Sequence, residues 1–253
     1  MRAVGKLGRL PHDPVLYAKL PAIGKHMDAL LDAEPPPSPD WTRNVASGTL
    51  GMCLNDKYGD CTCAAVAHAL TVWESYCPPL SFMPDDDVLT LYERVCPGFD
   101  PATDSNDNGA VIADVLKAWI SGVQCAGAVD KLTAFHTIDP TNHNHIRAAI
   151  WAFGVLDVGI VLRQSDDDDF DQGNIWVKST GPILGGHCVI AAAADDNGVK
   201  LGTWGQWQDA TWAWWDEAVE ECYTLLSPRW ISAGNTPSSL SVAMLEQDMQ
   251  SLA

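Results

Sequence analysis

A cysteine near the middle of the chain has the surroundings of a nucleophile. Cys61 follows a polar, glycine-containing loop, residues 55–60, and begins an alanine-rich stretch with helical spacing. Unpaired N–H groups and the positive end of the helix dipole favour a thiolate at that position. Cys63 falls on the apolar side of the same predicted helix. Cys61 is therefore the better nucleophile and the thiol expected to be most reactive; the alternative is that both cysteines are small core residues.

The base that a thiol nucleophile needs is usually a histidine, and the chain has 7. His68 lies about 10 Å from Cys61 along the same predicted helix, at 1.5 Å per residue, and is too far away. His187 follows Gly185-Gly186, where a backbone or a substrate can approach closely, and it opens an apolar strand. The sequence favours a Cys61–His187 pair over a purely structural role for this histidine.

The order and spacing of these residues resemble the papain-like cysteine peptidases. That family has an oxyanion-hole glutamine six residues before the nucleophile, and here 61 − 55 = 6 places Asn55 there. Its histidine opens a strand, as His187 does 187 − 61 = 126 residues after the cysteine. Its Trp-Gly pair after the next strand matches Trp204-Gly205. The resemblance covers residues 50–226 and is to divergent members found in bacteria and their phages.

The resemblance implies a fold and an activity. The fold would be α+β, with a helical left subdomain and an antiparallel β right subdomain. The activity would be a peptidase or amidase acting on a peptide or protein substrate. Cys61 would attack, His187 would move the proton, Asn55 would bind the oxyanion, Trp204 would shield the histidine and Gly186 would lie beside it. This chemistry needs no cofactor and no metal.

The third catalytic position departs from the family pattern. The orienting asparagine normally stands two residues before the tryptophan, and Gly202 occupies that position. Thr203 is expected to point to the opposite face of the strand from Gly202. Gln206 lies past the turn, where it could reach the ring. The sequence therefore favours a bare Cys–His dyad first and orientation by Gln206 second. Asn55 also departs, being one methylene shorter than glutamine, but it keeps an amide donor.

Helical periodicity dominates the first half of the chain, and short apolar runs follow, which predicts the α+β class independently. Helices are expected at 14–31 with a break at Pro21, and at 60–76, 85–96, 109–122, 143–153 and 240–252. Strands are expected at 155–162, 186–194, 199–204 and 223–226, with a hairpin at Asp196-Asn197-Gly198.

The predicted organisation is an N-terminal extension and one domain. Residues 1–40 contain too few apolar residues for a core of their own and a proline-rich stretch at 35–39, so they form an arm. The papain-like domain would span 41–253, with a helical part at 41–153, a β part at 154–230 and a C-terminal helix at 238–252. The sequence leaves open whether the arm covers the groove as a pro-segment would.

Three further patterns have simpler explanations. Residues 104–109 match the first half of a calcium loop, but position twelve is Val115, so helix capping is favoured. The acidic run at 166–171 predicts a solvated loop, with attraction of a basic substrate as the alternative. The five tryptophans between Trp204 and Trp215 predict an aromatic core, with stacking on cell-wall sugars as the alternative.

Composition limits the partners. Of 253 residues, 33 are acidic and 15 are Lys or Arg, which gives a net charge of −18 and disfavours binding to nucleic acid or anionic membranes. No signal peptide or membrane-spanning segment is visible, which predicts a cytoplasmic or virion-associated protein. Most of the 8 cysteines are expected to be reduced and structural, with one doing chemistry.

Two functions of different class therefore remain. The first is a papain-like thiol hydrolase. The second is a catalytically weak or inactive structural or binding protein with the same fold, for instance a phage virion component that assembles into a larger particle. Peptidoglycan hydrolysis of the NlpC type is less favoured, because that family places its histidine much nearer the cysteine in sequence.

Overall fold

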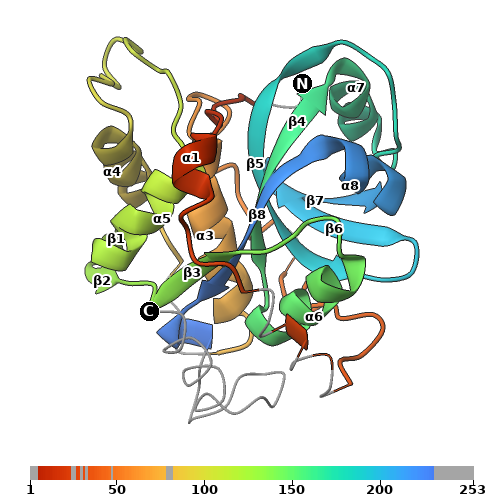
Figure 1. Ribbon diagram of the computed structural model, residues 1–253. Coiled ribbons are helices and arrows are strands. Elements are labelled where there is room, and N and C mark those ends of the chain that lie inside the picture. Colours follow the sequence, from red (N-terminus) through yellow and green to blue (C-terminus); the bar gives the residue numbers. More distant parts are fainter. Residues whose placement is uncertain are drawn as a thin grey trace.

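A helical half and a sheet half lie side by side in the computed structural model, which describes residues 5–23, 27–28, 31, 34–46, 48–77 and 82–230 (Figure 1). The helical half contains α3 (Cys61–Glu74), α4 (Asp85–Val95), α5 (Ile112–Ser121), β1 (Val123–Cys125) and β2 (Ala128–Asp130). The sheet half contains β3 (Ala134–Thr137), β4 (Leu156–Arg163), β5 (Ile183–Ala194), β6 (Gly198–Thr203), β7 (Gln206–Thr211) and β8 (Val219–Leu226). The remaining elements are α1 (Pro14–Tyr17), α6 (His143–Phe153), α7 (Gln164–Gln172), α8 (Trp212–Ala218) and the 3-10 turn Pro228–Trp230.

The large sheet has the strand order β3-β8-β4-β5-β6-β7, and each neighbouring pair is antiparallel. Its register decides which side chains share a face. Ile190 of β5 pairs with Gly202 of β6. Since side chains alternate along a strand, His187 and Thr203 both point to the face opposite to Ile190 and Gly202. The sheet therefore brings a histidine and a hydroxyl to the same side.

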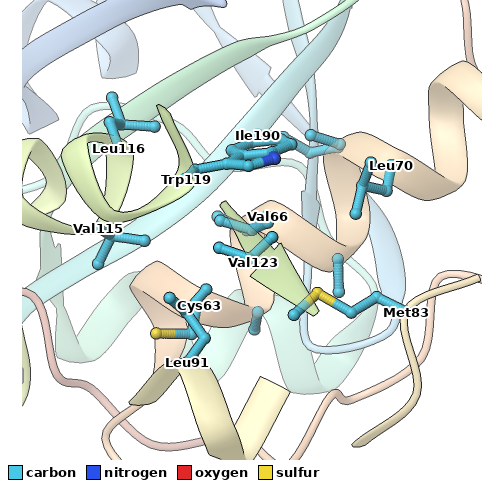
Figure 2. Close-up of a cluster of buried hydrophobic side chains, with 14 of the residues drawn as sticks. Cys63, Val66, Leu70, Met83, Leu91, Val115, Leu116, Trp119, Val123 and Ile190 are labelled. Carbon is cyan, nitrogen blue, oxygen red and sulfur yellow. The ribbon is translucent and has the colours of Figure 1, made fainter. Parts of the chain in front are cut away.

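Helix α3 is the central helix, and every residue from Cys61 to Glu74 is buried. Its alanines allow neighbouring elements to approach closely, while its larger side chains fill the helical half. In Figure 2, Cys63, Val66 and Leu70 of α3 lie in one cluster with Trp119 of α5 and Ile190 of β5. This packing against both halves fixes the position of the helix start, and so of Cys61.

Most of the predicted elements are confirmed, as is the α+β class. The predicted helices at 60–76, 85–96, 109–122 and 143–153 correspond to α3, α4, α5 and α6, and the four predicted strands fall in β4, β5, β6 and β8. Asp13 caps α1 through the N–H groups of Val15 and Leu16, and this helix ends at Tyr17. Residues 27, 28 and 31 are again helical, in line with the break expected at Pro21. The predicted C-terminal helix, 238–252, lies outside the described residues.

The acidic run is helical, so the prediction of a solvated loop was wrong. It forms α7, and Asp166 is buried. The Asp166 carboxylate accepts the backbone N–H of Arg163 at 2.7 Å and the indole N–H of Trp214 at 3.0 Å. Trp214 packs on Trp176 inside the second core cluster, in line with the aromatic core expected there. The hydrogen bonds from the Arg163 N–H and the Trp214 indole thus stabilise the buried Asp166 carboxylate, although a run of acidic residues is usually exposed to solvent.

The calcium-like loop, residues 104–109, makes hydrogen bonds to other parts of the protein. Its Asp107 accepts the N–H of Gly59 at 2.9 Å and the hydroxyl of Tyr92 at 2.6 Å. Across the described ranges, no cluster of three or more His, Cys, Asp or Glu side chains is arranged to hold a metal ion. Within the same ranges, no helix combines the length and apolar character needed to cross a bilayer.

Candidate active site

Cys61 is the first residue of α3, and its side chain is buried. Its thiol lies at the backbone of Cys188, the residue after His187, and at the backbone of Gly8. Burial raises the pKa of this thiol to about 12, against the opposing effects of those two backbone contacts and of Arg9, while the Asp60 charge raises it further. At neutral pH Cys61 is therefore a neutral thiol in this arrangement.

His187 lies on β5 with its ring fully buried. Its Nε2 is 2.7 Å from Thr203 Oγ1, and Trp204 stacks on the ring with a centroid distance of 4.5 Å. Nδ1 is also buried and makes no hydrogen bond within the described residues. Burial lowers the pKa of His187 to about 3, with smaller contributions from His68 and Arg9. The ring is neutral, and one of its nitrogens is available for a proton.

The hydrogen bond to His187 favours Thr203 over Gln206 as the orienting residue. Thr203 and Gly202 point to opposite faces of β6, as expected from the alternation of side chains along a strand. The His187 imidazole lies on the face of Thr203. A Cβ at Gly202 would meet Ile190 at 2.8 Å, on the other face. Gln206 is exposed and pairs with Thr203 across the tight turn between β6 and β7. The register of the predicted hairpin between the strands of His187 and Thr203 would have placed both side chains on the same face of the sheet, and so indicated Thr203 as the partner of the ring.

Asn55 lies close to the start of α3, but its amide is used locally. Its Nδ2 donates to Tyr58 O at 3.1 Å and to Asp60 Oδ1 at 3.2 Å, which accounts for both amide hydrogens. Burial raises the pKa of Asp60 to about 8, and its second oxygen has no hydrogen-bond partner within the described residues. Asn55 must turn away from these acceptors before it can bind an oxyanion.

Residues 5–10, here called the closing segment, pass from the sheet half to the helical half (Figure 1, red end of the chain). The backbone of Gly8 in this segment lies at the Cys61 thiol. The segment makes backbone hydrogen bonds to the loop before α3, to the sheet and to the loop before α5: Lys6 N to Asn55 O at 2.7 Å, Arg9 N to Gly186 O at 3.2 Å, Leu10 N to Ala110 O at 2.9 Å, and Ala110 N to Gly8 O at 2.9 Å. These bonds hold the segment against the start of α3 and against the strand that carries His187.

Two glycines allow the closing segment to lie flat on the site. A Cβ at Gly8 would lie 1.7 Å from the carbonyl oxygen of Gly59, and one at Gly5 would lie 2.0 Å from Nε1 of Trp204. No real Cβ approaches other atoms so closely, so neither position accepts a side chain without displacement. The sequence left open whether the N-terminal arm covers the groove, and it did not single out residues 5–10. The signal of this segment is the pair Gly5 and Gly8, three residues apart, with Arg9 directly after the second glycine.

Arg9 carries the most deeply buried charge in the closing segment. Its side chain is 2% exposed and donates to Glu221 Oε1 at 2.6 Å and to Glu220. Glu221 is fully buried and also accepts the hydroxyl of Tyr223 at 2.6 Å. The sequence analysis missed both members of this pair, which are 212 residues apart.

Comparisons with known proteins identify the fold. No profile of a known protein family matches the chain, and no curated protein sequence does. Among solved structures, xylellain, a cysteine protease from Xylella fastidiosa, superposes with a TM-score of 0.64 at 15% identity, covering 90% of this chain and 98% of that one. The fold is papain-like.

Two more papain-like structures match over most of the chain. Procathepsin B from Trypanosoma congolense gives a TM-score of 0.60 at 11% identity, covering 81% of this chain and 80% of that one. A Carica candamarcensis cysteine protease in complex with E-64 gives a TM-score of 0.54 at 13% identity, covering 76% of this chain and 99% of that one. The papain-like fold predicted from residues 50–226 is thereby confirmed. At these identities the likeness concerns the fold, and the chemistry has to be argued from the site.

Proposed function

We propose that this chain is a papain-like thiol hydrolase that cleaves peptide bonds or related amides, and that its N-terminal arm holds it closed. The observation that carries the proposal is that the Cys61 thiol, at a helix N-terminus, lies at the backbone of the residue that follows His187, while Nε2 of His187 lies 2.7 Å from Thr203 Oγ1. Nδ1 of the ring makes no hydrogen bond to Cys61 or to any other described residue, so it is available to take the proton of the thiol. Nucleophile, base and orienting group are thus in one place.

The closing segment keeps both reacting groups neutral. Burial raises the pKa of Cys61 and lowers the pKa of His187, and both changes disfavour a thiolate–imidazolium pair. When the segment leaves, water reaches the site and the burial penalty falls. The proton can then pass from the Cys61 thiol to His187 Nδ1, and each charge stabilises the other.

The reaction follows from these positions. The Cys61 thiolate attacks the carbonyl carbon, and the oxyanion is bound by the Cys61 backbone N–H and, after it turns, by the Asn55 amide. His187 gives its proton to the leaving amine, whose C–N bond breaks to leave a thioester on Cys61. A water molecule then attacks the thioester while His187 takes its proton. The C–S bond breaks and the carboxylic acid is released. Cys61 is then again a thiolate and His187 is again protonated, which is the starting pair.

Peptide cleavage by an opened full-length chain tests this proposal. Gly8→Ala should displace the closing segment, because the new Cβ would collide with the Gly59 carbonyl. We expect the Gly8→Ala chain to cut members of a mixed peptide pool, detected as new amino termini by mass spectrometry, and the native chain to cut far fewer. Cys61→Ser in the opened chain should abolish every cut. An opened, folded chain without Cys61-dependent cleavage would instead favour an inactive structural or binding protein, such as a virion component.

A further inference from the structure

Cys188 is a second buried cysteine beside Cys61, and the proposed reaction does not use it. It directly follows His187 on β5, and the Cys61 thiol lies at its backbone. The side chains of Cys61 and Cys188 belong to the same core cluster. Since side chains alternate along a strand, Cys188 points to the face of Ile190, which packs against α3 (Figure 2). The two cysteines therefore meet between the helix and the sheet.

The position of the Cys61 sulfur suits a bond to the Cys188 sulfur. The Cα atoms of two cysteines joined in a disulfide lie about 4.4–6.8 Å apart. A cysteine sulfur in contact with the backbone of a second cysteine brings the two Cα atoms to about this separation. The pKa of the Cys188 thiol is raised by burial first, then by Asp157 and by Cys61, which agrees with two neighbouring sulfurs.

The other cysteines near the site are placed less well. Cys63 is two residues after Cys61 on α3, and side chains with that spacing do not face each other on a helix. Cys222 of β8 pairs with Val158 and belongs to the second core cluster, on the other face of the sheet. Cys188 is therefore the expected partner of Cys61.

Asp157 of β4 supplies a base for the Cys188 thiol. The S–H of Cys188 donates to Asp157 Oδ1 at 2.9 Å, and both side chains are buried. Burial raises the pKa of Asp157 to about 7, against the opposing effect of the hydrogen bond from Cys188, while Glu221 raises it further. A carboxyl group that titrates near neutral pH both accepts and releases protons there. A buried neutral thiol needs such an acceptor before its sulfur can attack.

We propose that Cys61 and Cys188 form a reversible disulfide when hydrogen peroxide reaches the opened chain, with Asp157 as the proton acceptor. Formation of the bond depends on the two thiols and the carboxylate. Its consequence, a reversible stop of peptide cleavage, rests on the proposed function. In the closed chain Cys61 is buried and Gly8 lies at its thiol, so the peroxide is excluded.

The disulfide forms in two steps. The Cys61 thiolate attacks one oxygen of the peroxide: an S–O bond forms, the O–O bond breaks, and the hydroxide that leaves takes up the proton that the thiol had lost and becomes water. The Cys188 sulfur then attacks the Cys61 sulfur while its proton passes to Asp157. The S–S bond forms, the S–O bond breaks, and the leaving hydroxide takes the proton from Asp157. Two thiols are oxidised to one disulfide, and one peroxide is reduced to two water molecules.

The bond to Cys188 spares Cys61 from irreversible damage. A sulfenic acid with no thiol beside it is oxidised further to a sulfinic acid, which ordinary thiol reductants do not reverse. A disulfide is instead reduced by thiol exchange, which returns both thiols. The fate of Cys61 under peroxide therefore depends on Cys188.

Peptide mapping without reduction tests the proposal. The full-length Gly8→Ala chain is treated with hydrogen peroxide, its remaining thiols are alkylated, and it is digested. We expect the Cys61 peptide linked to the Cys188 peptide, with at least about tenfold less of this product from the native chain, where the thiol is buried. Arg9→Ala, which removes the ion pair with Glu221, releases the closing segment in a second way and should give the same product. Oxidation of Cys61 to a sulfinic acid beside a free Cys188, or a cross-link to another cysteine, would overturn the proposal.

Three substitutions in the Gly8→Ala chain separate the roles. With Cys188→Ser, dithiothreitol should recover roughly tenfold less alkylatable Cys61 after peroxide than in the parent chain. Cys63→Ala is the matched control and should leave the cross-link unchanged. Asp157→Asn keeps the size of the side chain but cannot take the proton, and it should slow the cross-link by at least about tenfold. Equal recovery with Cys188→Ser, or an unchanged rate with Asp157→Asn, would overturn the role given to that residue.

Peptide cleavage distinguishes this proposal from the proposed function. Where the Gly8→Ala chain cleaves peptides, peroxide should stop the cleavage and dithiothreitol should restore it. Formation of the Cys61–Cys188 cross-link in a chain that cleaves nothing would support the disulfide and contradict the hydrolase. Cleavage that continues at full rate after the cross-link is complete would overturn the switch.

Discussion

Replacing Gly8 with alanine is expected to speed the alkylation of Cys61 by iodoacetamide by at least a factor of about a thousand at pH 7.5. In the closed chain the pKa of Cys61 is about 12, while an exposed cysteine has a pKa of about 8.5. Each unit of that difference changes the thiolate fraction about tenfold well below the pKa. The thiolate, which is the species that reacts, should therefore become far more abundant once the closing segment is displaced.

The native chain should behave differently from the expectation based on sequence alone. All eight cysteines lie in the described part of the chain, and Cys77 is the one that is only half-buried. Limited alkylation of the native chain should therefore label Cys77 before Cys61. Leu10→Ala is the matched control, because that side chain is 40% exposed and its removal leaves the closing segment in place. If Gly8→Ala remains folded and alkylates at the native rate, the closing segment does not control access to Cys61.

Replacing His187 with glutamine in the opened chain is expected to lower kcat on any cleaved peptide by roughly 10²–10⁴, the usual contribution of a general base and acid. Thr203→Val removes the hydroxyl that is 2.7 Å from Nε2 and keeps the shape of the side chain. One hydrogen bond of about 1 kcal/mol corresponds to a loss of roughly tenfold or less in rate. The measurement is the initial rate at saturating peptide.

Two comparisons make this series specific. Thr203→Ser keeps the hydroxyl and should recover most of the rate lost in Thr203→Val. Gln206→Ala should change the rate by less than about twofold, because Thr203 rather than Gln206 is bonded to Nε2. A large loss with Gln206→Ala and none with Thr203→Val would return the orienting role to Gln206. Full activity of His187→Gln would remove the histidine from the mechanism.

The start of α3 and the strand that carries His187 could be predicted because their signals are local. A polar loop running into an alanine-rich helix, and a glycine pair before an apolar run, are patterns of neighbouring residues. The position of Thr203 needed one more step, the register of β5 against β6. That register puts His187 and Thr203 on one face, and alternation within β6 alone could not show it.

The closing segment and the partners of Arg9 could not be predicted in this way. Arg9 and Glu221 meet only after the whole sheet has formed, and each looks like an ordinary surface charge in the sequence. Asp166 is similar, since its burial depends on Trp214 from α8. These contacts come from tertiary packing, which supplies the partner that makes burial of a charge tolerable.

The pH dependence of Cys61 alkylation in the Gly8→Ala chain tests most directly whether Cys61 and His187 act as a pair. A neighbouring imidazolium favours the thiolate and lowers the pKa of the thiol. If the two residues act as a pair, the alkylation rate of the Gly8→Ala chain is already high at pH 6 and changes little up to pH 8. When His187 is also replaced by glutamine, the rate is low at pH 6 and rises once, near pH 8.5. A rise near pH 8.5 in both chains would contradict the pairing.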